Sequence, residues 1–431
     1  MFLLQKSTTS RTANTNELRM VAQPVKFSLI PVLTLFFLVA LEAPGSSQEP
    51  GRLLFIRQGD IFVIGELSQR LSRLTKSGQV WSFTVSPDKK WVYYLEKGDI
   101  WKMDGKGKRK FPISRTKGNI SGFGFSLSPD GKYLAYDLIV EYVACCAQEE
   151  ANHPVTDLWL MRSDGTGQRK VNWPPPKERY GENVFENIVL ESWYPDSQRL
   201  LARGVGILET DNNYWEVNIL TNEIKKFDLY GSYPTGLMPN IHFSPTGDKI
   251  AYTPTDTDDI WIMDIDGANK RKVFTARGFL SWVTFSPDGK YLAAQMNNKE
   301  AGESLIIFDL NGTIIYEEKS AKKGVGFANL EWSKDSRFVA SRHYSSSGEK
   351  RADKLAVTDL LTKRTRFFSA QPKIFGFKFL ENGRLYYVVS SSDPKERDKT
   401  MPQVWVVDPR NWENKRALNN ALLPEWVPRG K

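Results

Sequence analysis

The chain has 431 residues, of which 40% are hydrophobic and 25% charged, a balance typical of globular proteins. Two cysteines exclude a disulfide scaffold or a cysteine-rich zinc domain, and three histidines leave little material for a histidine-based metal or acid–base site. The net charge of +9 excludes an acidic solvating protein and does not by itself indicate a nucleic-acid binder. Many glycines, prolines and tryptophans favour an all-β fold.

The N-terminal residues 1–47 resemble a targeting segment. An apolar core at residues 27–41 follows Lys26 and precedes small residues, and its 15 residues are fewer than the roughly 20 that a spanning helix needs. The stretch before it is long for a signal peptide, so Met20 is an alternative start to Met1. We expect export to the periplasm or the extracellular space. An uncleaved membrane anchor, which would associate with the membrane through residues 27–41, is the alternative to cleavage.

Beyond Gly51 the sequence repeats a short turn motif, in which an aromatic or apolar residue and Ser-Pro-Asp-Gly-Lys precede an apolar strand. The turns recur every 42 to 66 residues, a spacing that suits the blades of a β-propeller. The seven copies, two of them degenerate, are anchored at Pro87, Pro129, Pro195, Pro245, Pro287, Lys334 and Glu381.

Each repeat predicts four strands. In the unit anchored on Pro245 we expect strands at 240–243, 249–253, 259–264 and 270–275. Proline fixes the negative φ of the turn, and glycine or asparagine tolerates the positive φ near its end. The third strand recurs as an Asp-Ile-Trp-like segment whose large residues should pack against the neighbouring blade.

The two ends of the repeat region predict how the ring closes. Residues 425–431 resemble an inner strand and turn with no second strand after them, whereas residues 51–56 resemble a second strand with no inner strand before it. We therefore expect the termini to share one blade, because an open ring would present unpaired strand edges. Seven internal anchors and this shared blade give an all-β propeller of eight blades over residues 51–431, with seven blades as the alternative.

The repeats resemble the TolB-like propeller family. The resemblance is carried by Ser-Pro-Asp-Gly-Lys turns such as 128–132 and 286–290, and by the strand 259–264 with Asp266-Gly267 after it. It extends over nearly all of residues 51–431 and implies the propeller fold. TolB itself has an additional α/β domain before its propeller, and here only about ten residues separate the leader from the first strand. The resemblance therefore implies a propeller without the TolB N-terminal domain, and it transfers no envelope role directly.

The residues offer little for catalysis, and we expect no catalytic residue, metal or cofactor. No Gly-x-Ser-x-Gly elbow occurs, and the sequence leaves no room for the hydrolase domain of propeller peptidases. Some lyases that resemble these blades hold a metal with several channel-facing histidines, whereas here His242 alone is well placed, on an inner strand. Calcium-like acidic turns at 255–259 and 264–267 lack the twelve-residue spacing. Cys145-Cys146 lies in an insertion, 138–156, which we expect to be a surface loop. The alternative is that its cysteine, histidine and glutamate residues bind a soft metal.

Basic pairs such as Arg271-Lys272 fall at the starts of fourth strands, the outer edges of the blades. Charges there discourage edge-to-edge aggregation, so the positive excess is spread around the rim, and we expect no nucleic-acid partner. A weak attraction to anionic lipid or to an acidic polymer remains open.

The long connections predict a binding face. Second-to-third and fourth-to-first connections share one face of a propeller, and the long insertions at 138–156, 172–186, 344–351 and 390–402 all fall there. Aromatic and arginine side chains are effective interface anchors. The candidate partner-binding residues are Trp173, Lys177, Arg179, Tyr180, Tyr344, Lys395 and Arg397.

Two functions follow as hypotheses. The first is an exported, monomeric, non-enzymatic propeller that binds a protein or glycan at the cell envelope through its long-loop face. The second is a polysaccharide lyase or hydrolase with its active site at the channel mouth.

Overall fold

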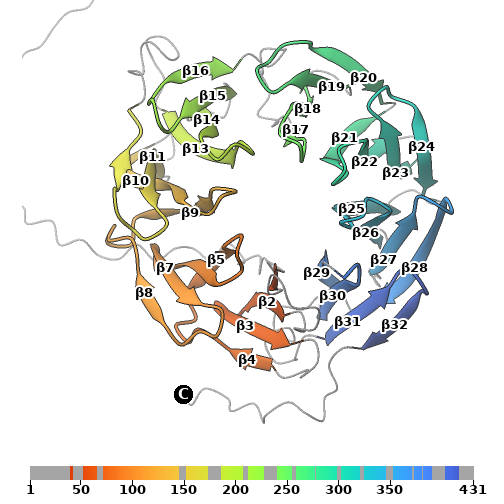
Figure 1. The fold of residues 1–431 in the computed structure, drawn as a ribbon, viewed down its shortest axis with the longest axis horizontal. Helices are drawn as coiled ribbons and strands as arrows, with labels where there is room; N and C mark the ends of the chain where they lie inside the picture. The colour runs from red at the N-terminus through yellow and green to blue at the C-terminus, as the bar shows by residue number, and fades with distance from the viewer. Residues whose placement is uncertain are drawn as a thin grey trace, which may run out of the picture. The chain divides into compact units, whose positions relative to one another are not determined.

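The fold is all-β in the computed structural model, and four consecutive strands pair antiparallel in each sheet (Figure 1). All described residues belong to the larger of two units of the chain, residues 35–431. The structure describes residues 39–41, 52–65, 71–144, 152–172, 186–206, 212–227, 240–254, 259–276, 278–298, 302–320, 325–345, 353–370, 373–380, 382–390 and 403–416. In these ranges no helix has the length and apolar character needed to cross a membrane.

Each sheet is one blade of a β-propeller, and the eight blades follow one another in chain order around a ring. The first two blades are β1 (Val39–Leu41), β2 (Arg52–Arg57), β3 (Asp60–Gly65), β4 (Leu71–Arg73), then β5 (Val80–Val85), β6 (Trp91–Glu96), β7 (Asp99–Asp104), β8 (Lys110–Pro112). The third and fourth are β9 (Ile120–Leu127), β10 (Tyr133–Ala144), β11 (Asn152–Arg162), β12 (Arg169–Lys170), then β13 (Glu186–Trp193), β14 (Arg199–Gly206), β15 (Asn212–Asn218), β16 (Ile224–Phe227).

The other half of the ring has the same order. The fifth and sixth blades are β17 (Asn240–Phe243), β18 (Lys249–Thr253), β19 (Asp259–Asp264), β20 (Arg271–Thr275), then β21 (Phe279–Phe285), β22 (Tyr291–Asn298), β23 (Gly302–Asp309), β24 (Ile314–Lys319). The seventh and eighth are β25 (Val325–Trp332), β26 (Phe338–Ser345), β27 (Asp353–Asp359), β28 (Arg364–Ala370), then β29 (Lys373–Phe379), β30 (Leu385–Ser390), β31 (Gln403–Asp408), β32 (Glu413–Arg416). The eight-bladed prediction is confirmed.

The repeated turn owes its sequence to one hydrogen-bonded arrangement. In the third blade the Ser128 hydroxyl accepts a hydrogen bond from the Tyr133 amide at 2.9 Å and donates one to Asp130 at 2.7 Å. Gly131 supplies the positive φ, +74°, that closes the turn before β10. Ser286, Asp288 and Tyr291 repeat these contacts in the sixth blade.

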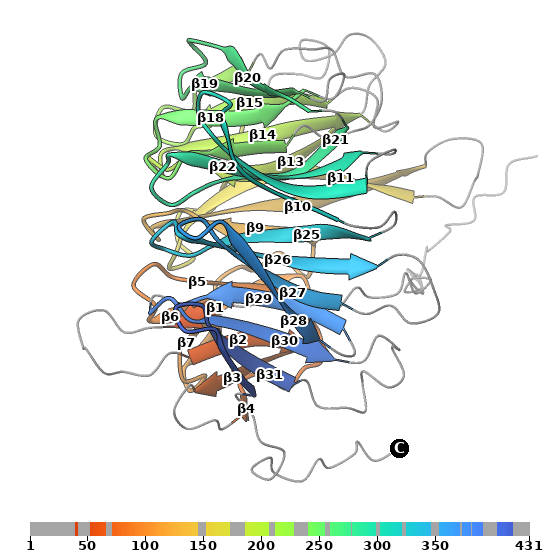
Figure 2. The same cartoon turned by 90° about the vertical axis from the view of Figure 1, so that its right-hand side faces the viewer.

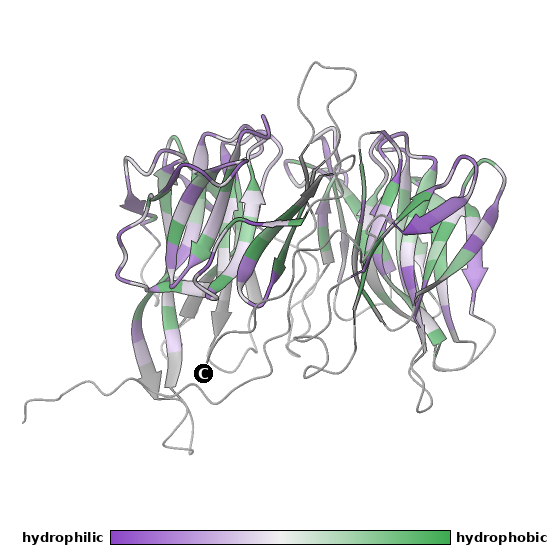
Figure 3. Ribbon diagram, turned by 90° about the horizontal axis from the view of Figure 1, so that it is seen from below, coloured by the Kyte–Doolittle hydropathy of each residue, from purple (hydrophilic) through white to green (hydrophobic). Residues whose placement is uncertain are grey.

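Apolar side chains between successive blades form the core. In Figure 3 many of the short connections have the colour of hydrophilic residues. Each core cluster joins two neighbouring blades, as when Ala251 and Ile260 of the fifth pack with Leu292 and Phe308 of the sixth. The same arrangement closes the ring. Residues of β2 and β3 pack against the eighth blade in one cluster, comprising Phe55, Phe62, Leu380, Tyr386, Val388, Val404 and Val406.

The structure differs from our expectation in how the first blade is completed. Its inner strand is β1, from the apolar core of the predicted leader, and β1 pairs with β2 through Val39↔Leu54, Ala40↔Leu53 and Leu41↔Arg52. The segment between β1 and β2 is short, so pairing these strands costs little loop-closure entropy. A strand from the other end of the chain would pay a larger entropic cost. Residues 425–431, which we expected in this position, lie outside the described residues.

Two predicted insertions are partly strand. Residues 138–144 and 152–156, which we expected in a surface loop, extend β10 and β11 as a paired hairpin, because Ile139, Val140, Tyr142 and Val143 suit a strand. Tyr344 also lies within a strand, β26, where it pairs with Gly326. Its side chain is therefore positioned by the blade rather than by a loop.

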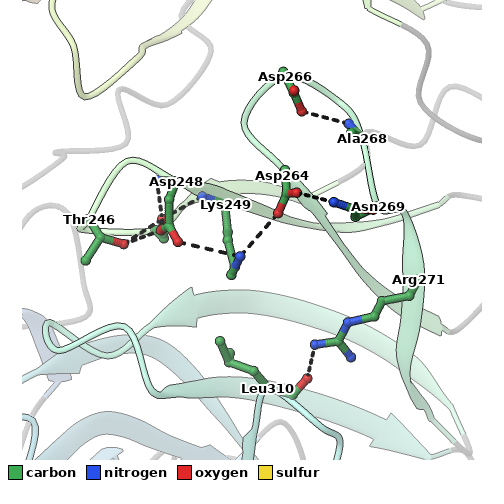
Figure 4. A network of polar contacts seen from close by, with 10 residues as sticks. Thr246, Asp248, Lys249, Asp264, Asp266, Ala268, Asn269, Arg271 and Leu310 are labelled. Carbon is green, nitrogen blue, oxygen red and sulfur yellow. Dashed lines mark hydrogen bonds and ion pairs between the residues drawn. The ribbon is translucent and has the colours of Figure 1, made fainter.

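The short turns opposite the long connections use their polar groups internally (Figure 4). Asp264 accepts hydrogen bonds from Asn269 at 2.6 Å and from Lys249 at 3.2 Å, while Asp266 accepts one from the Ala268 amide at 2.9 Å. Arg271 reaches the next blade, where it donates to the Leu310 carbonyl at 2.8 Å. The carboxylates of this calcium-like turn therefore have structural hydrogen-bond partners.

We predict that Gly312→Ala destabilises the ring more than Gly267→Ala. Both glycines lie between a third and a fourth strand with φ near +87°, a conformation that costs an L-residue roughly 1–2 kcal/mol. A Cβ at Gly312 would also overlap the Val273 carbonyl oxygen of the neighbouring blade, whereas no atom lies within 4 Å at Gly267. Urea unfolding should therefore give a lower midpoint for Gly312→Ala. Equal midpoints would show that this contact between blades is unimportant.

Candidate functional site

Eight residues were predicted either to bind a partner or to line the channel, and two of them lie in the described ranges. Tyr344 lies on β26, and His242 lies on β17, an inner strand as predicted. The other six lie outside the described residues, namely Trp173, Lys177, Arg179 and Tyr180 within 173–185 and Lys395 and Arg397 within 391–402. The site is therefore described from the strands, and in particular from the strand ends on the long-loop face.

One equivalent position on the second strands separates the blades into two groups. It pairs with a residue near the start of the third strand, as Leu95 pairs with Ile100 and Gln295 with Leu305. Three consecutive blades have an apolar residue there, Val388, Ile56 and Leu95. The five other consecutive blades have a polar residue there, Asp137, Arg203, Thr253, Gln295 and Arg342. We call these five residues the polar arc.

The polar arc is not required by the fold. Asp137, Arg203, Thr253 and Gln295 are each at most 6% exposed, and burying such groups is costly unless they are paired. Three blades form the same sheet with valine, isoleucine or leucine at this position. All five residues precede second-to-third connections, so the arc lies on the long-loop side.

At one end of the arc, Asp137 contacts the next blade. It accepts a hydrogen bond from the Leu190 amide of β13 at 3.1 Å, and Glu191, the following residue, pairs with Arg203. Burial raises the pKa of Asp137 to about 7, and nearby Glu191 adds to the increase, against the Leu190 hydrogen bond and Arg203. Glu191 has no paired residue on β14 because a β-bulge lies between Leu190 and Ser192. Such a bulge changes the direction in which a side chain points.

At the other end, Glu303 is held by three neutral donors. It accepts hydrogen bonds from Gln295 at 2.9 Å, from Asn297 at 3.4 Å and from the Tyr344 hydroxyl at 3.1 Å to each carboxylate oxygen. Gly326 makes room for this carboxylate, since a Cβ there would overlap it. The Gln295 Oε1 atom is buried and accepts no hydrogen bond in the described part of the chain.

Arg342 continues this cluster into the eighth blade. Its Nε atom lies 3.3 Å from Asp353 Oδ2, and its guanidinium lies 5.4 Å from the centre of the Tyr344 ring. Asp353 also accepts a hydrogen bond from the Ile374 amide of β29 at 3.1 Å. Burial, with Glu303 beside it, raises the pKa of Tyr344, so its hydroxyl stays protonated and can donate. Sequence analysis identified only Tyr344 in this cluster.

The inner strands carry a second set of polar groups. Lys378 of β29 lies 2.5 Å from Glu331 of β25, an ion pair between adjacent blades, and burial raises the pKa of Glu331. Burial lowers the pKa of His242 to about 4, so its imidazole is neutral at neutral pH. His343 instead packs edge-on between Phe327 and Phe367, with ring centres 5.1 and 5.0 Å away, and has a packing role.

Metal binding finds no support in the described ranges, where no group of three or more His, Cys, Asp or Glu residues is arranged to hold an ion. Cys145 and Cys146 lie outside these ranges. The site is therefore a set of fixed donors, acceptors and charges, an arrangement suited to recognising a polar ligand.

Comparison with known proteins identifies the fold. The sequence matches no family model and no curated protein. Among solved structures, dihydro-heme d1 dehydrogenase NirN in complex with DHE is 12% identical, with a TM-score of 0.59 over 87% of this chain and 74% of that chain. The oligogalacturonate lyase of Vibrio parahaemolyticus is 11% identical, with a TM-score of 0.54 over 88% and 98%. TolB of Acinetobacter baumannii is 13% identical, with a TM-score of 0.37 over 88% and 79%. At these identities the likeness shows the propeller fold alone.

We predict that Asp137 makes stability depend on pH. Because the folded-state pKa of this acid is raised to about 7 from about 4 in the unfolded chain, the unfolded state releases the proton first as the pH rises. Stability should therefore fall between about pH 4 and pH 7, by up to about 4 kcal/mol for a three-unit shift.

The Asp137→Asn variant removes this titration while retaining an acceptor for the Leu190 amide. Its free energy of unfolding, relative to the unaltered protein, should increase from pH 5 to pH 8 in urea titrations. Parallel pH profiles for the two proteins would contradict the prediction.

Proposed function

We propose that this chain is an exported, non-enzymatic propeller that binds a protein or glycan partner at the cell envelope through its long-loop face. The observation on which the proposal rests is the polar arc. Five consecutive blades place polar groups, four of them buried, where three other blades show that an apolar residue suffices. The polar groups lie at the end of the ring where the long connections fall, and loops on a rigid scaffold commonly bind ligands.

Several details favour recognition over catalysis. The charges of the arc are held in place by ion pairs to adjacent strands of the same blade, Arg203–Glu191 and Arg342–Asp353, so these groups are fixed before a ligand arrives. His242, with a pKa of about 4, is a weak base at neutral pH and a poor match for general acid–base work.

Export is supported by the leader pattern of residues 1–47, with the apolar core at 27–41. The TolB-like turns agree with a binding propeller outside the cytoplasm. The long-loop face also includes Trp173, Lys177, Arg179, Tyr180, Lys395 and Arg397 in the sequence, which supply aromatic and basic anchors for a partner.

The second candidate is a polysaccharide lyase or hydrolase, and one observation favours it. His242, Glu331 and Lys378 all lie on inner strands, which surround the centre of the ring. Turnover on a panel of polysaccharides, together with metal analysis of the purified protein, separates the two functions. If the unaltered protein turns over a polysaccharide and His242→Ala does not, the enzymatic function would replace the binding proposal.

We predict that Glu303→Gln weakens partner capture at least tenfold while the ring stays folded. The substitution keeps the size of the side chain and removes the charge that Gln295, Asn297 and Tyr344 surround. Capture is measured by photo-crosslinking in whole cells and by binding to a glycan array, with thermal melting as the check on folding.

The matched control is Lys106→Ala, an exposed residue in a short turn on the opposite face. Trp173→Ala and Arg179→Ala enter the same assay as tests of the loop residues. Capture that is unchanged in Glu303→Gln, Trp173→Ala and Arg179→Ala, or reduced equally in Lys106→Ala, would refute binding through the long-loop face.

A further inference from the structure

The hairpin of β10 and β11 projects beyond the third blade. In Figure 2 these yellow strands extend past the ends of their neighbours. Pairing with the inner strand β9 ends at Leu138↔Ile120, whereas pairing with β11 continues from Glu141↔Val155 to Ala144↔Asn152. We call residues 141–144 and 152–155 the arm.

One edge of the arm has no strand beside it in the described ranges. Because the sheet order is β12-β11-β10-β9, the free edge of β10 lies on the side of β9, the innermost strand. An added strand there would continue the sheet in the position that β9 occupies lower in the blade. Unpaired N–H and C=O groups on such an edge are a template for an extended peptide.

The two edges of the arm differ in protection. Pro154 of β11 pairs with Tyr142, and a proline is tolerated in a strand only where its missing N–H faces away from the partner strand. The outer edge of the arm is therefore blocked by Pro154. The β10 edge contains neither proline nor lysine, whereas the outer strands elsewhere carry basic residues such as Lys110, Arg271 and Lys415.

Exposed apolar side chains lie on this edge. Tyr142 is 56% exposed, and Val140, at the bulge where β9 pairing ends, is 48% exposed. Aromatic and β-branched residues favour cross-strand pairs with similar residues on an added strand. The arm thus has both the backbone and the side chains that strand addition uses.

The charge of the hairpin selects the partner. Residues 138–156 contain Glu141, Glu149 and Glu150 and no lysine or arginine, although the chain as a whole has a net charge of +9. Glu141 is exposed at the start of the free edge. Like charges repel across a strand pair and opposite charges attract, so a basic strand fits best.

We propose that the arm binds an extended, basic peptide segment of a partner protein, which adds to the free edge of β10 as a β-strand. This proposal rests on the proposed function, because the arm belongs to the long-loop face, and it identifies the partner as a protein rather than a glycan.

The test uses the full chain and three synthetic nine-residue peptides, a basic one (Lys-Val-Thr-Val-Lys-Val-Thr-Val-Lys), the same sequence with glutamate for lysine, and the basic one N-methylated at alternate residues. The basic peptide should bind in fluorescence anisotropy, and the other two should bind at least tenfold more weakly. Amides of residues 141–144 should gain protection from hydrogen exchange when the basic peptide is bound.

Two variants and a control assign the binding to the arm. Glu141→Lys should weaken the basic peptide at least tenfold, and Tyr142→Thr, which keeps a strand-forming residue, about fivefold. Leu361→Thr, at a residue that is 74% exposed in a short turn on the opposite face, should leave the affinity unchanged.

Binding that is unaffected by Glu141→Lys, or that leaves residues 141–144 unprotected, would overturn the proposal. So would a preference for the acidic peptide, or self-association in sedimentation that Glu141→Lys abolishes, because a second copy would then be the occupant. If the arm variants bind normally while Glu303→Gln loses partner capture, the proposed function stands and the arm proposal alone fails.

Discussion

In the described residues strand pairing stays within each blade, and backbone hydrogen bonds between blades occur at single points such as Val80 N–H to the Gly59 carbonyl, so the ring depends mainly on side chains packed between blades. Each apolar cluster joins two neighbours, and the cluster of Phe55, Phe62 and Val388 joins the eighth blade to the first. Fully burying side chains of this kind stabilises a fold by about 1.5–3 kcal/mol each. Both faces of every sheet are committed to this packing, which leaves strand ends and connections for recognition. The polar arc and the arm both lie at such ends.

Much of the fold could be predicted from the sequence because its turns have a local cause. The Ser128, Asp130 and Gly131 contacts involve neighbours in the chain, so the same letters produce the same turn in each blade. In the fifth blade the first three strands begin and end where we predicted. The closing strand depends instead on competition between distant segments with similar patterns. Residues 39–41 were assigned to the leader, and their pairing with β2 could not be anticipated from local signals.

The candidate site was harder to predict than the fold. Sequence analysis favoured loop residues and a single histidine, and only Tyr344 and His242 fall in described ranges. The polar arc appears only when equivalent positions are aligned through strand pairing. Bulges shift the count within strands, and the turn of the eighth blade is one residue shorter, since Leu380 bonds to Arg384 where Ser333 bonds to Phe338. A comparison of second strands across repeats, allowing for such shifts, is the signal that would have found it.

The position of β1 connects the predicted leader to the architecture of the ring. The three residues that complete the first blade also end the apolar core of the predicted leader. A protease that cut after residue 47 would remove this strand and expose the inner edge of β2. The blade would then have three strands until some other segment occupied the vacancy. If the predicted leader is retained the first blade stays whole, and if it is cleaved completion of the ring becomes a separate, later assembly step.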